Sequence, residues 1–244
     1  VLCESFIHMT GEMRNLIDTI YREQEKHRRE ELNALQAQIN PHFLYNTLDS
    51  IIWSLRMLQV EESIEMLTAL TDFFKISLSK GRDIITIEEE VKHIKSYLSI
   101  QHRRYQEKFD YDIHVDPSIL SCRTPKLILQ PVVENAIYHG IKPMEEKGYI
   151  YIHIFPQEGD VILQVQDTGM GMDEDTCRRL NRELDTISSD QQGTGYGVRN
   201  VNDKIKIVYG SKYGVTIESA MGEGTVVTLR IGKKGEASDE SDYL

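Results

Sequence analysis

The stretch from Gln38 to Leu48, "QINPHFLYNTL", puts a proline directly before a histidine inside an otherwise helical pattern. A proline within a helix costs about 3 kcal/mol, because it removes a hydrogen bond and crowds the preceding turn. Asn40 can cap a new helical start, and Pro41 suits a first helical position. We therefore expect a helix to begin at the proline and to expose His42.

His42 lies on the polar side of this predicted helix. At about 100° per residue, it is about 200° away from Leu44, which opens the apolar stripe. Tyr45, Asn46 and Asp49 share the face of the histidine. A histidine on an apolar face is usually a packed core residue, whereas this one is expected in solvent. The apolar stripe consists of Leu44, Leu48, Ile51, Leu55 and Leu58.

Two more helices follow. The second ends near Lys80, and the third, from Ile87 to Gln106, begins with a capping box of Thr86 and Glu89. A hairpin of the first two helices carries a larger apolar stripe than it can cover by itself. Two paired hairpins form a four-helix bundle, so we expect a dimer through residues 30–80. The apolar face of the second helix consists of Ile64, Leu67, Leu70 and Phe74.

Residues 1–25 carry a coiled-coil pattern, which stops in the charged and polar run from Tyr21 to Glu31. The pattern resumes at Leu32, where it is out of phase with the preceding heptads. Two interpretations stay open: a solvated helix with a loose middle, or a helix that transmits movement between registers. The seam before the break consists of Phe6, Met9, Met13, Leu16 and Ile20.

From Phe109 onward the pattern changes to short strands and glycine turns. "FDYDIHV", "YIYIHIF" and "VILQVQD" alternate as strands, and "GVTIESAMGEGTVVTLRI" is typical of a hairpin. "PKLILQPVVENAIYHG" is expected to be a helix from Pro125 to Gly140. This order predicts an α+β sandwich, followed by a polar, disordered tail at residues 235–244.

The composition excludes several classes of protein. The 244 residues include 39 acidic and 28 basic ones, and the formal charge of -11 argues against a nucleic-acid or anionic-membrane surface. Three widely spaced cysteines suggest neither a disulfide framework nor a zinc site. No stretch approaches the roughly 18 apolar residues of a membrane span, and no signal peptide opens the chain. Because the first residue is Val1 and not methionine, we expect a piece of a longer protein.

Three segments of the second half carry chemistry. "DTGMG" (167–171) puts an acid at a strand end before two glycines that allow close backbone approach. "ENAIYHG" (134–140) offers a carboxylate and an amide oxygen on a helix. "GTGYGVRNV" (193–201) is a loop that leads into a helix whose N-terminus would attract phosphate. Neither glycine segment matches a P-loop or the dinucleotide fingerprint.

In this order, behind that histidine, the segments closely resemble sensor histidine kinases of the LytS/YesM type. "LQAQINPHFLYNTLDSI" is similar to the phospho-acceptor box of that family, and "LILQPVVENAIYHGI" to its N box. "DTGMGM" and "GTGYGVRNVNDKI" are similar to its two G boxes, so the resemblance covers about residues 26–233.

The resemblance implies a division into domains. Residues 26–106 would form the dimerisation and phospho-acceptor domain, a helical hairpin that becomes a four-helix bundle in the dimer. Residues 107–234 would form an α/β-sandwich ATP-binding domain of the GHKL (Bergerat) type. Residues 1–25 resemble the closing helix of a HAMP linker. The family then implies a membrane span and a sensor domain that precede this cytoplasmic portion, with the full-length protein in the cell membrane.

The resemblance also implies roles by position. His42 matches the residue phosphorylated from ATP, and Asn135 matches the asparagine whose side-chain oxygen binds Mg²⁺. Asp167 matches the acid that accepts the adenine amino group, and Thr225 matches a hydroxyl that supports adenine recognition. The glycines divide into Gly169 and Gly171, which would pack the base, and Gly193, Gly195 and Gly197, which would form the lid end over the phosphates.

The chain departs from the commonest histidine kinases in two places. Phe43 stands where an acid usually follows the acceptor, and Tyr138 and His139 replace the usual lysine and tyrosine after the N-box asparagine. The proton acceptor must then come from elsewhere, and Glu134 is favoured over Asp49. Two roles stay open: Glu134 either serves as this base or only braces its helix, and His139 either packs or contacts the nucleotide.

The function implied is that of a homodimeric autokinase, which passes its phosphate from His42 to an aspartate on a response regulator. Asn46 matches the position that directs water to the regulator's phosphate in related kinases. Two alternatives stay open: a gyrase- or chaperone-type ATPase with Glu134 as the base for water, and a degenerate module that binds ATP or a partner without chemistry. The acceptor box argues against the first, and Asn135 with the glycine loops argues against the second.

Overall fold

The computed structural model describes residues 41–78, 82–105, 108–185 and 196–233. The chain divides into two compact units, residues 1–49 and 50–244. The coiled coil predicted before the acceptor histidine, the cap at Asn40, Gly193, Gly195 and the polar tail all lie outside the described residues. The predicted domain boundaries stay predictions.

Helix α2 spans Pro41–Arg56, and Pro41 is the first residue that the structure describes. Within the first unit, His42, Tyr45 and Asp49 are exposed, as expected for the polar face of this helix, whereas Asn46 of the same predicted face is half-buried. Thr47 is buried, and its hydroxyl donates a 2.7 Å hydrogen bond to the carbonyl oxygen of Phe43. The side chain of His42 is therefore accessible from solvent in this unit.

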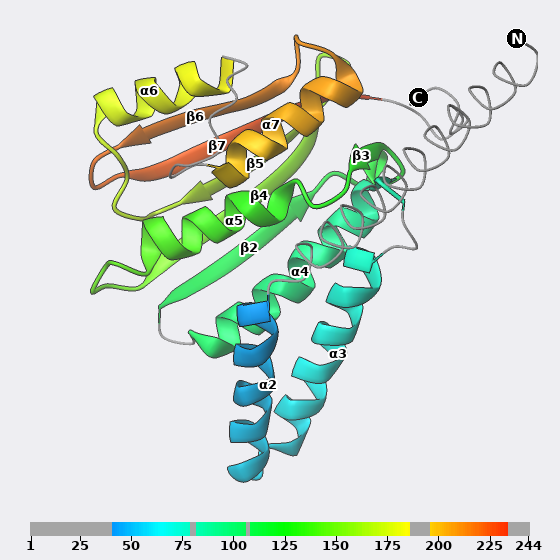
Figure 1. The fold of residues 1–244 in the computed structure, drawn as a ribbon, viewed down its shortest axis with the longest axis vertical. Helices are drawn as coiled ribbons and strands as arrows, with labels where there is room; N and C mark the ends of the chain where they lie inside the picture. Colours follow the sequence, from blue (N-terminus) through cyan, green and yellow to red (C-terminus); the bar gives the residue numbers. More distant parts are fainter. Residues whose placement is uncertain (1–40, 79–81, 106–107, 186–195, 234–244) are drawn as a thin grey trace, which may run out of the picture. The chain divides into compact units, whose positions relative to one another are not determined.

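In the second unit, two long helices follow the last turns of α2 (Figure 1). α3 spans Val60–Leu78 and α4 spans Ile87–Arg104. The predicted capping box is confirmed, since the Glu89 N–H donates to Thr86 Oγ1 at 3.1 Å and the Thr86 N–H donates to Glu89 Oε2 at 2.9 Å. No helix among the described residues has both the length and the apolar character needed to cross a membrane.

The predicted apolar face of α3 is only partly the face that the chain buries. Leu70 is buried, but Ile64 and Leu67 are 51% and 45% exposed. The packed side faces α4 instead, where the Phe73 ring stacks on His93 with centroids 4.5 Å apart. The periodicity did not distinguish two apolar faces, one that meets α4 and one that stays open in a single chain. The buried side of α3 consists of Ser63, Met66, Leu70, Phe73 and Ser77.

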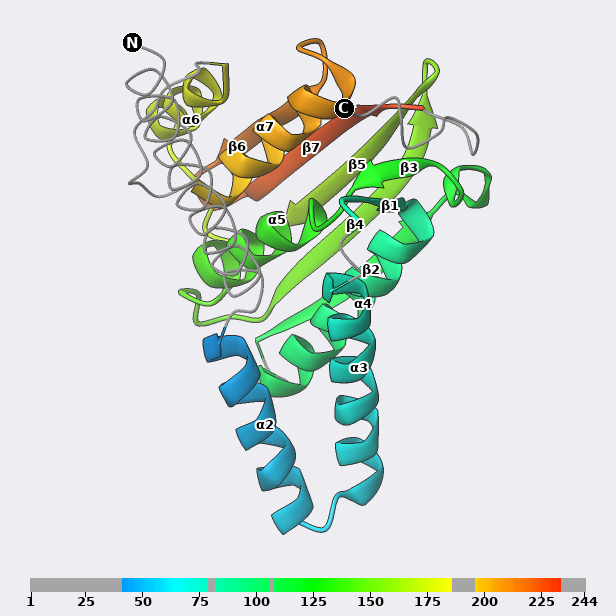
Figure 2. The ribbon, with the colours of Figure 1, turned by 45° about the vertical axis from the view of Figure 1, so that its right-hand side comes forward.

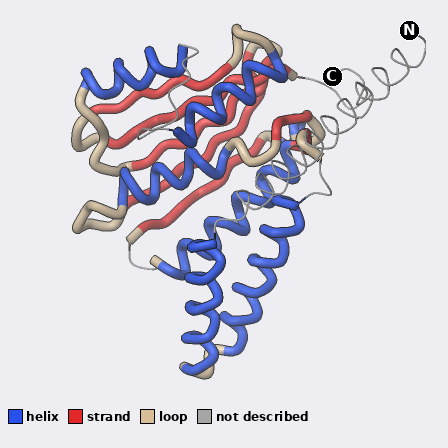
Figure 3. Tube along the Cα trace, viewed as in Figure 1, coloured by secondary structure: helices blue, strands red, loops and turns tan. Residues whose placement is uncertain are grey.

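A five-stranded sheet forms the core of the second unit (Figure 3). Its strand order is β2-β4-β5-β7-β6, in which β2 runs parallel to β4 and the other pairs are antiparallel. All five strands were predicted from alternating apolar residues. Their bounds are Phe109–Val115 for β2, Gly148–Gln157 for β4, Asp160–Asp167 for β5, Gly214–Ala220 for β6 and Gly224–Gly232 for β7.

Helices cover one face of this sheet (Figures 1 and 2). They are α5 (Leu129–Asn135) with its π-helical continuation η3 (Ala136–Ile141), α6 (Glu174–Asp185) and α7 (Tyr196–Tyr209). The alternating residues Ile150, Ile152 and Ile154 of β4 are buried beneath them, while Gln166 and Thr216 on the opposite face are exposed. The predicted α+β sandwich is thereby confirmed.

The start of the helix predicted at Pro125 is wrong. Arg123–Pro125 forms strand β3, which pairs antiparallel with β1 (Ile84–Thr86). Leu127 then adopts a left-handed conformation with φ 59°, and α5 begins only at Leu129. The helical segment also continues past Gly140, to Ile141. A short 3₁₀-helix, Pro117–Ile119, precedes β3.

Candidate functional site

Asp167 is a buried carboxyl at the end of β5. Its Oδ1 accepts a 2.8 Å hydrogen bond from the N–H of Gly169, and the carboxyl also accepts from the N–H of Thr225, the residue opposite it on β7. Burial raises the pKa of this carboxyl to about 6, although both backbone bonds act to lower it. A carboxyl group can accept more hydrogen bonds than these two. Asp167 can therefore accept a further hydrogen bond from a ligand N–H.

Two glycines press directly against Asp167. A Cβ atom on Gly169 would lie 2.5 Å from the Gly140 backbone and 2.5 Å from Asp167 Oδ1, and one on Gly140 would lie 2.7 Å from the same oxygen. The Met170 N–H also donates to the carbonyl of Gly140 at 3.0 Å. The end of the η3 segment and the loop after β5 are thus held together around the carboxyl, in a space that only glycine leaves open. From the sequence, Gly140 was predicted only to end a helix.

Gly171 lies on the same loop after β5 as Gly169, and Thr225 lies on the neighbouring strand β7. Gly171 has φ 64°, and a Cβ atom there would lie 1.9 Å from the carbonyl oxygen of Ala220, so it packs against the β6–β7 turn. The Thr225 hydroxyl lies 2.9 Å from that of Ser219, its partner across the hairpin. Asp167, Gly169, Gly171 and Thr225 therefore lie close together, and the roles expected for them stay predictions. Ser219 was missed because only strand register places it there.

Asn135 is the last residue of α5, half-buried, and its side chain has no hydrogen-bond partner among the described residues. His139 follows in η3 and is exposed. The N–H of Lys142 donates to the carbonyl of Ile137 at 2.8 Å, a five-residue spacing that widens this turn. Such π-helical turns are frequent at functional sites. The predicted N box is thus a helical segment with an available amide and a widened turn.

Glu134 is held from two sides. The Gln130 amide donates to its Oε1 at 2.9 Å, and the Tyr97 hydroxyl of α4 donates to its carboxylate. Burial raises the pKa of Glu134, and these two hydrogen bonds lower it. Tyr97 was not predicted as a site residue. Its spacing of four from Gln101 on one helical face was the available signal.

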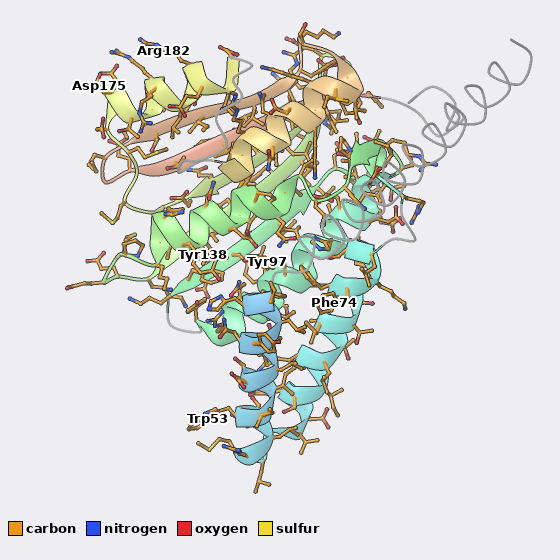
Figure 4. All side chains as sticks on the ribbon, in the orientation of Figure 1. Trp53, Phe74, Tyr97, Tyr138, Asp175 and Arg182 are labelled. Atoms are coloured by element: carbon orange, nitrogen blue, oxygen red, sulfur yellow. The ribbon has the colours of Figure 1, made fainter. Side chains whose placement is uncertain are left out.

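Tyr138 contacts α4 from the N-box side (Figure 4). Gln101 donates its amide hydrogens to Tyr97 Oη at 2.8 Å and to Tyr138 Oη at 3.2 Å. The Lys142 ammonium lies 5.4 Å from the centroid of the Tyr138 ring. Tyr138, which stands where the commonest histidine kinases have a lysine, thus forms a contact between α4 and η3.

Gly197 lies in the first turn of α7, the helix predicted after the second glycine loop. A Cβ atom there would lie 3.2 Å from Cβ of Pro131, so α7 begins close to α5. The described residues hold no group of three or more His, Cys, Asp or Glu side chains that could bind a metal ion. Asn135 nevertheless fits Mg²⁺, which proteins often hold through one or two ligands together with substrate phosphates.

Two family models match consecutive parts of the chain. The histidine kinase model matches residues 30–109. The model of histidine kinase-, DNA gyrase B-, and HSP90-like ATPases matches residues 123–235, which include Asn135, Asp167 and the glycine segments.

Several curated bacterial proteins are similar over most of the chain. Sensor histidine kinase YesM of Bacillus subtilis is 34% identical over 232 residues, which are 94% of this chain and 38% of that protein. Sensor protein LytS of Bacillus cereus is 32% identical over 84% of this chain and 34% of its own length. Sensor histidine kinase YpdA of Escherichia coli is 34% identical over 74% of this chain and 31% of its own length. The chain thus spans about a third of the length of these relatives.

Two solved structures are more distantly similar. A catalytic domain of histidine kinase ThkA is 19% identical, with a TM-score of 0.47 over 63% of this chain and 97% of that one. The histidine kinase domain of a blue-light activated kinase from Erythrobacter litoralis is 16% identical, with a TM-score of 0.45 over 82% of this chain and 92% of that one.

Proposed function

Because the chain belongs to the sensor histidine kinases of the LytS/YesM type, we propose that it phosphorylates itself on His42 from ATP and passes the phosphoryl group to an aspartate of a response regulator. The observation that carries the proposal is the cradle of Asp167, Gly169 and Gly140, in which a buried carboxyl keeps acceptor capacity beside backbone. The same chain carries an exposed histidine, His42, within the segment that the histidine kinase model matches.

The nucleotide is assigned to the sheet unit. Asp167 would accept a hydrogen bond from the exocyclic amino group of adenine, since a carboxyl group is an acceptor of the right kind. The backbone of Gly169 and Gly171 leaves space for the base, and the Thr225–Ser219 hydroxyl pair borders the same loop. Asn135 would ligate Mg²⁺, which neutralises charge on the phosphates when it is bound.

Phosphoryl transfer requires little from the protein beyond the positioning of the reacting groups. A neutral imidazole nitrogen of His42 attacks the γ-phosphorus, an N–P bond forms, the bond to the bridging oxygen breaks, and ADP leaves. The proton on the other ring nitrogen must then be taken up by a base or by solvent. Glu134 is the proposed base, because burial raises its pKa toward the pH at which a carboxylate accepts protons best. Asp49, on the same α2 face as His42, is the alternative.

Three further assignments complete the proposal. Asn46 would orient water that hydrolyses the phosphate of the regulator, because an amide can do this by hydrogen bonding alone. The active form would be a homodimer, supported by exposed apolar residues on α3. The relatives are named as sensors, and the whole protein would be attached to the membrane through segments other than those described here.

Transfer to purified receiver domains tests the proposal. The protein is labelled with γ-labelled ATP, freed of nucleotide and mixed with receiver domains from the same genome. We expect label to move to an aspartate of a single regulator faster than to the others. A competing ATPase function with Glu134 as the base for water makes the opposite prediction: steady ATP hydrolysis at an unchanged rate in His42→Gln, with no transferable label.

A further inference from the structure

Two histidines lie side by side on neighbouring strands of the five-stranded sheet. His114 of β2 and His153 of β4 are directly opposite each other in the parallel register, and their ring centroids are 5.3 Å apart with the planes inclined by 45°. His153 is also opposite Gln164 of β5, which shares its face of the sheet with the exposed Gln166. The pair therefore lies on the face opposite the helices, away from Asn135 of α5.

One ring nitrogen of His114 already has a partner. Its Nε2 lies 3.0 Å from Asp112 Oδ2, two residues earlier on the same strand. When the ring is neutral, Nε2–H donates to the carboxylate and Nδ1 keeps a free lone pair. A histidine that binds a metal commonly donates its other N–H to a carboxylate in this way, which fixes the tautomer and makes the ligand nitrogen more basic. His114 thus has the outer partner that is typical of a metal ligand.

The ring nitrogens of His153 form no hydrogen bond with another described residue, so they are available to a ligand. The neighbourhood also suits a positive ion. The side chains next to the pair on the same face include Asp112, Tyr151 and Gln164, which together carry one negative charge and no positive charge. A cation at the two rings therefore meets a carboxylate and no ammonium or guanidinium group among these neighbours.

The spacing of the rings fits a single ion held by both. At a zinc–nitrogen distance of about 2.0–2.1 Å each ring centre lies about 3.2 Å from the ion, and a tetrahedral angle then puts the two centres about 5.2 Å apart. The observed distance between the centroids is 5.3 Å. Imidazole nitrogen suits zinc and similar transition metals, whereas Mg²⁺ and Ca²⁺ prefer oxygen ligands.

We propose that His114 and His153 form a binding site for a divalent transition-metal ion of the zinc class, in which each imidazole supplies one nitrogen ligand. The described residues offer no third His, Cys, Asp or Glu ligand at this place, so water completes the coordination of the ion. The site is therefore open, unlike a structural zinc site with four protein ligands. Because β2 is an edge strand of the sheet, the bound ion cross-links that edge to β4. The site is independent of the proposed kinase function.

Titration of the full chain with Zn²⁺, purified without a metal-binding tag, tests the proposal. Calorimetry in excess Mg²⁺ and without nucleotide compares the wild type, His114→Gln, His153→Gln and the double variant. We expect each single variant to lose at least about tenfold in zinc affinity, the smallest loss typical even of an outer partner of a metal ligand. The double variant should lose little more, because both rings hold the same ion. His102→Gln is the matched control, since this ring also lies 3.1 Å from a carboxylate, that of Asp110, but contacts no second described histidine.

The wild type alone gives a second readout. In NMR spectra, one equivalent of Zn²⁺ should shift the ring resonances of His114 and His153 together, and it should raise the unfolding midpoint of the wild type but not that of the double variant. Unchanged zinc affinity in either single variant would overturn the proposal. Additive losses, which indicate two separate weak sites, or an equal loss in His102→Gln would overturn it as well.

Discussion

The carboxylate of Glu90, wholly buried in α4, accepts a 2.8 Å hydrogen bond from the backbone N–H of Ile128, immediately before the first residue of α5. Leu127 and Leu129 donate to the same carboxylate at 2.9 and 2.8 Å. The first N–H groups of a helix have no partner within the helix, and a carboxylate at that end is favoured by the helix dipole. A residue of α4 thus supplies the N-terminal cap for the helix that carries Asn135.

Removal of this cap should destabilise the protein. We expect Glu90→Ala to lower the free energy of unfolding by about 3 kcal/mol, since each buried donor left without a partner costs about 1–3 kcal/mol. Urea unfolding measures the change. Lys95→Ala, an exposed substitution on the same helix, is the control and should change the free energy by less than about 0.5 kcal/mol. Equal values for the two variants would show that α5 does not need the cap.

The pH dependence of stability should carry a contribution from Asp167. Its pKa rises from 3.8 in the unfolded chain to about 6 in the folded protein because of burial. An acid with a raised folded pKa favours folding below its unfolded pKa and loses that contribution as the pH rises through the folded value. Between pH 3.8 and about 6, the wild type should therefore lose stability relative to Asp167→Asn. Unfolding midpoints of both proteins, taken without nucleotide, measure this gap, and a gap that stays constant with pH would contradict the raised pKa.

The close approach at Gly169 gives a steric prediction. In Gly169→Ala the new methyl group would meet the Gly140 backbone and Asp167 Oδ1 at 2.5 Å, so the loop after β5 must move. We expect ATP affinity to fall by more than about tenfold, which corresponds to about 1.4 kcal/mol. Gly210→Ala is the control: it introduces strain at φ 95° but meets nothing within 4 Å. Calorimetric titration with ATP measures both, and similar affinities would separate the Gly169 loop from the nucleotide.

The open face of α3 predicts dimerisation through the hairpin helices. Ile64→Glu should convert a dimer to a monomer in analytical ultracentrifugation, because a charge replaces apolar surface that a second chain would bury. Ile207→Glu, the same change at an 84% exposed site on α7, should leave the dimer intact. A wild-type monomer at micromolar concentration would contradict the bundle. Exposed apolar side chains of the second unit on this hairpin are Ile52, Trp53 (Figure 4), Leu55, Val60, Ile64 and Leu67.

Local patterns in the sequence predicted the parts of the fold that depend on neighbouring residues. The capping box at Thr86 and the alternation of the strands are set within a few positions. α6 was missed because it buries only Cys177 and Leu184, too few apolar residues to show a helical period. The late start of α5 was missed because it depends on β1 and on Glu90, which are distant in the chain.

The residues of the candidate site also fall into two groups, those that short motifs predict and those that only the packing of the fold brings together. Asp167 and the glycines beside it were named from short motifs, and the structure brings Asp167, Gly169, Gly171 and Thr225 together. Tyr97, in contrast, precedes Glu134 by 37 positions, and no motif links a tyrosine on one helix to a carboxylate on another. Partners of this kind follow from the packing of helices, which spacing along the chain does not reveal.

The nucleotide site and the acceptor should separate in binding experiments. His42→Gln should leave ATP affinity unchanged, because no contact with the nucleotide is assigned to this residue. Asn135→Asp should weaken Mg²⁺-ATP binding, because the change removes an amide that has no other partner among the described residues. Equilibrium binding of a fluorescent ATP analogue measures both. Equal affinities in Asn135→Asp and the wild type would remove the asparagine from the site.

Phosphosite mapping after incubation with γ-labelled ATP and Mg²⁺ tests the central claim most directly. The account predicts one phosphoryl group on His42, lost in acid and stable in base, and absent from His42→Gln although that variant still binds ATP. Label that survives acid, label on a different residue, or no label at all with ATP bound would contradict the account.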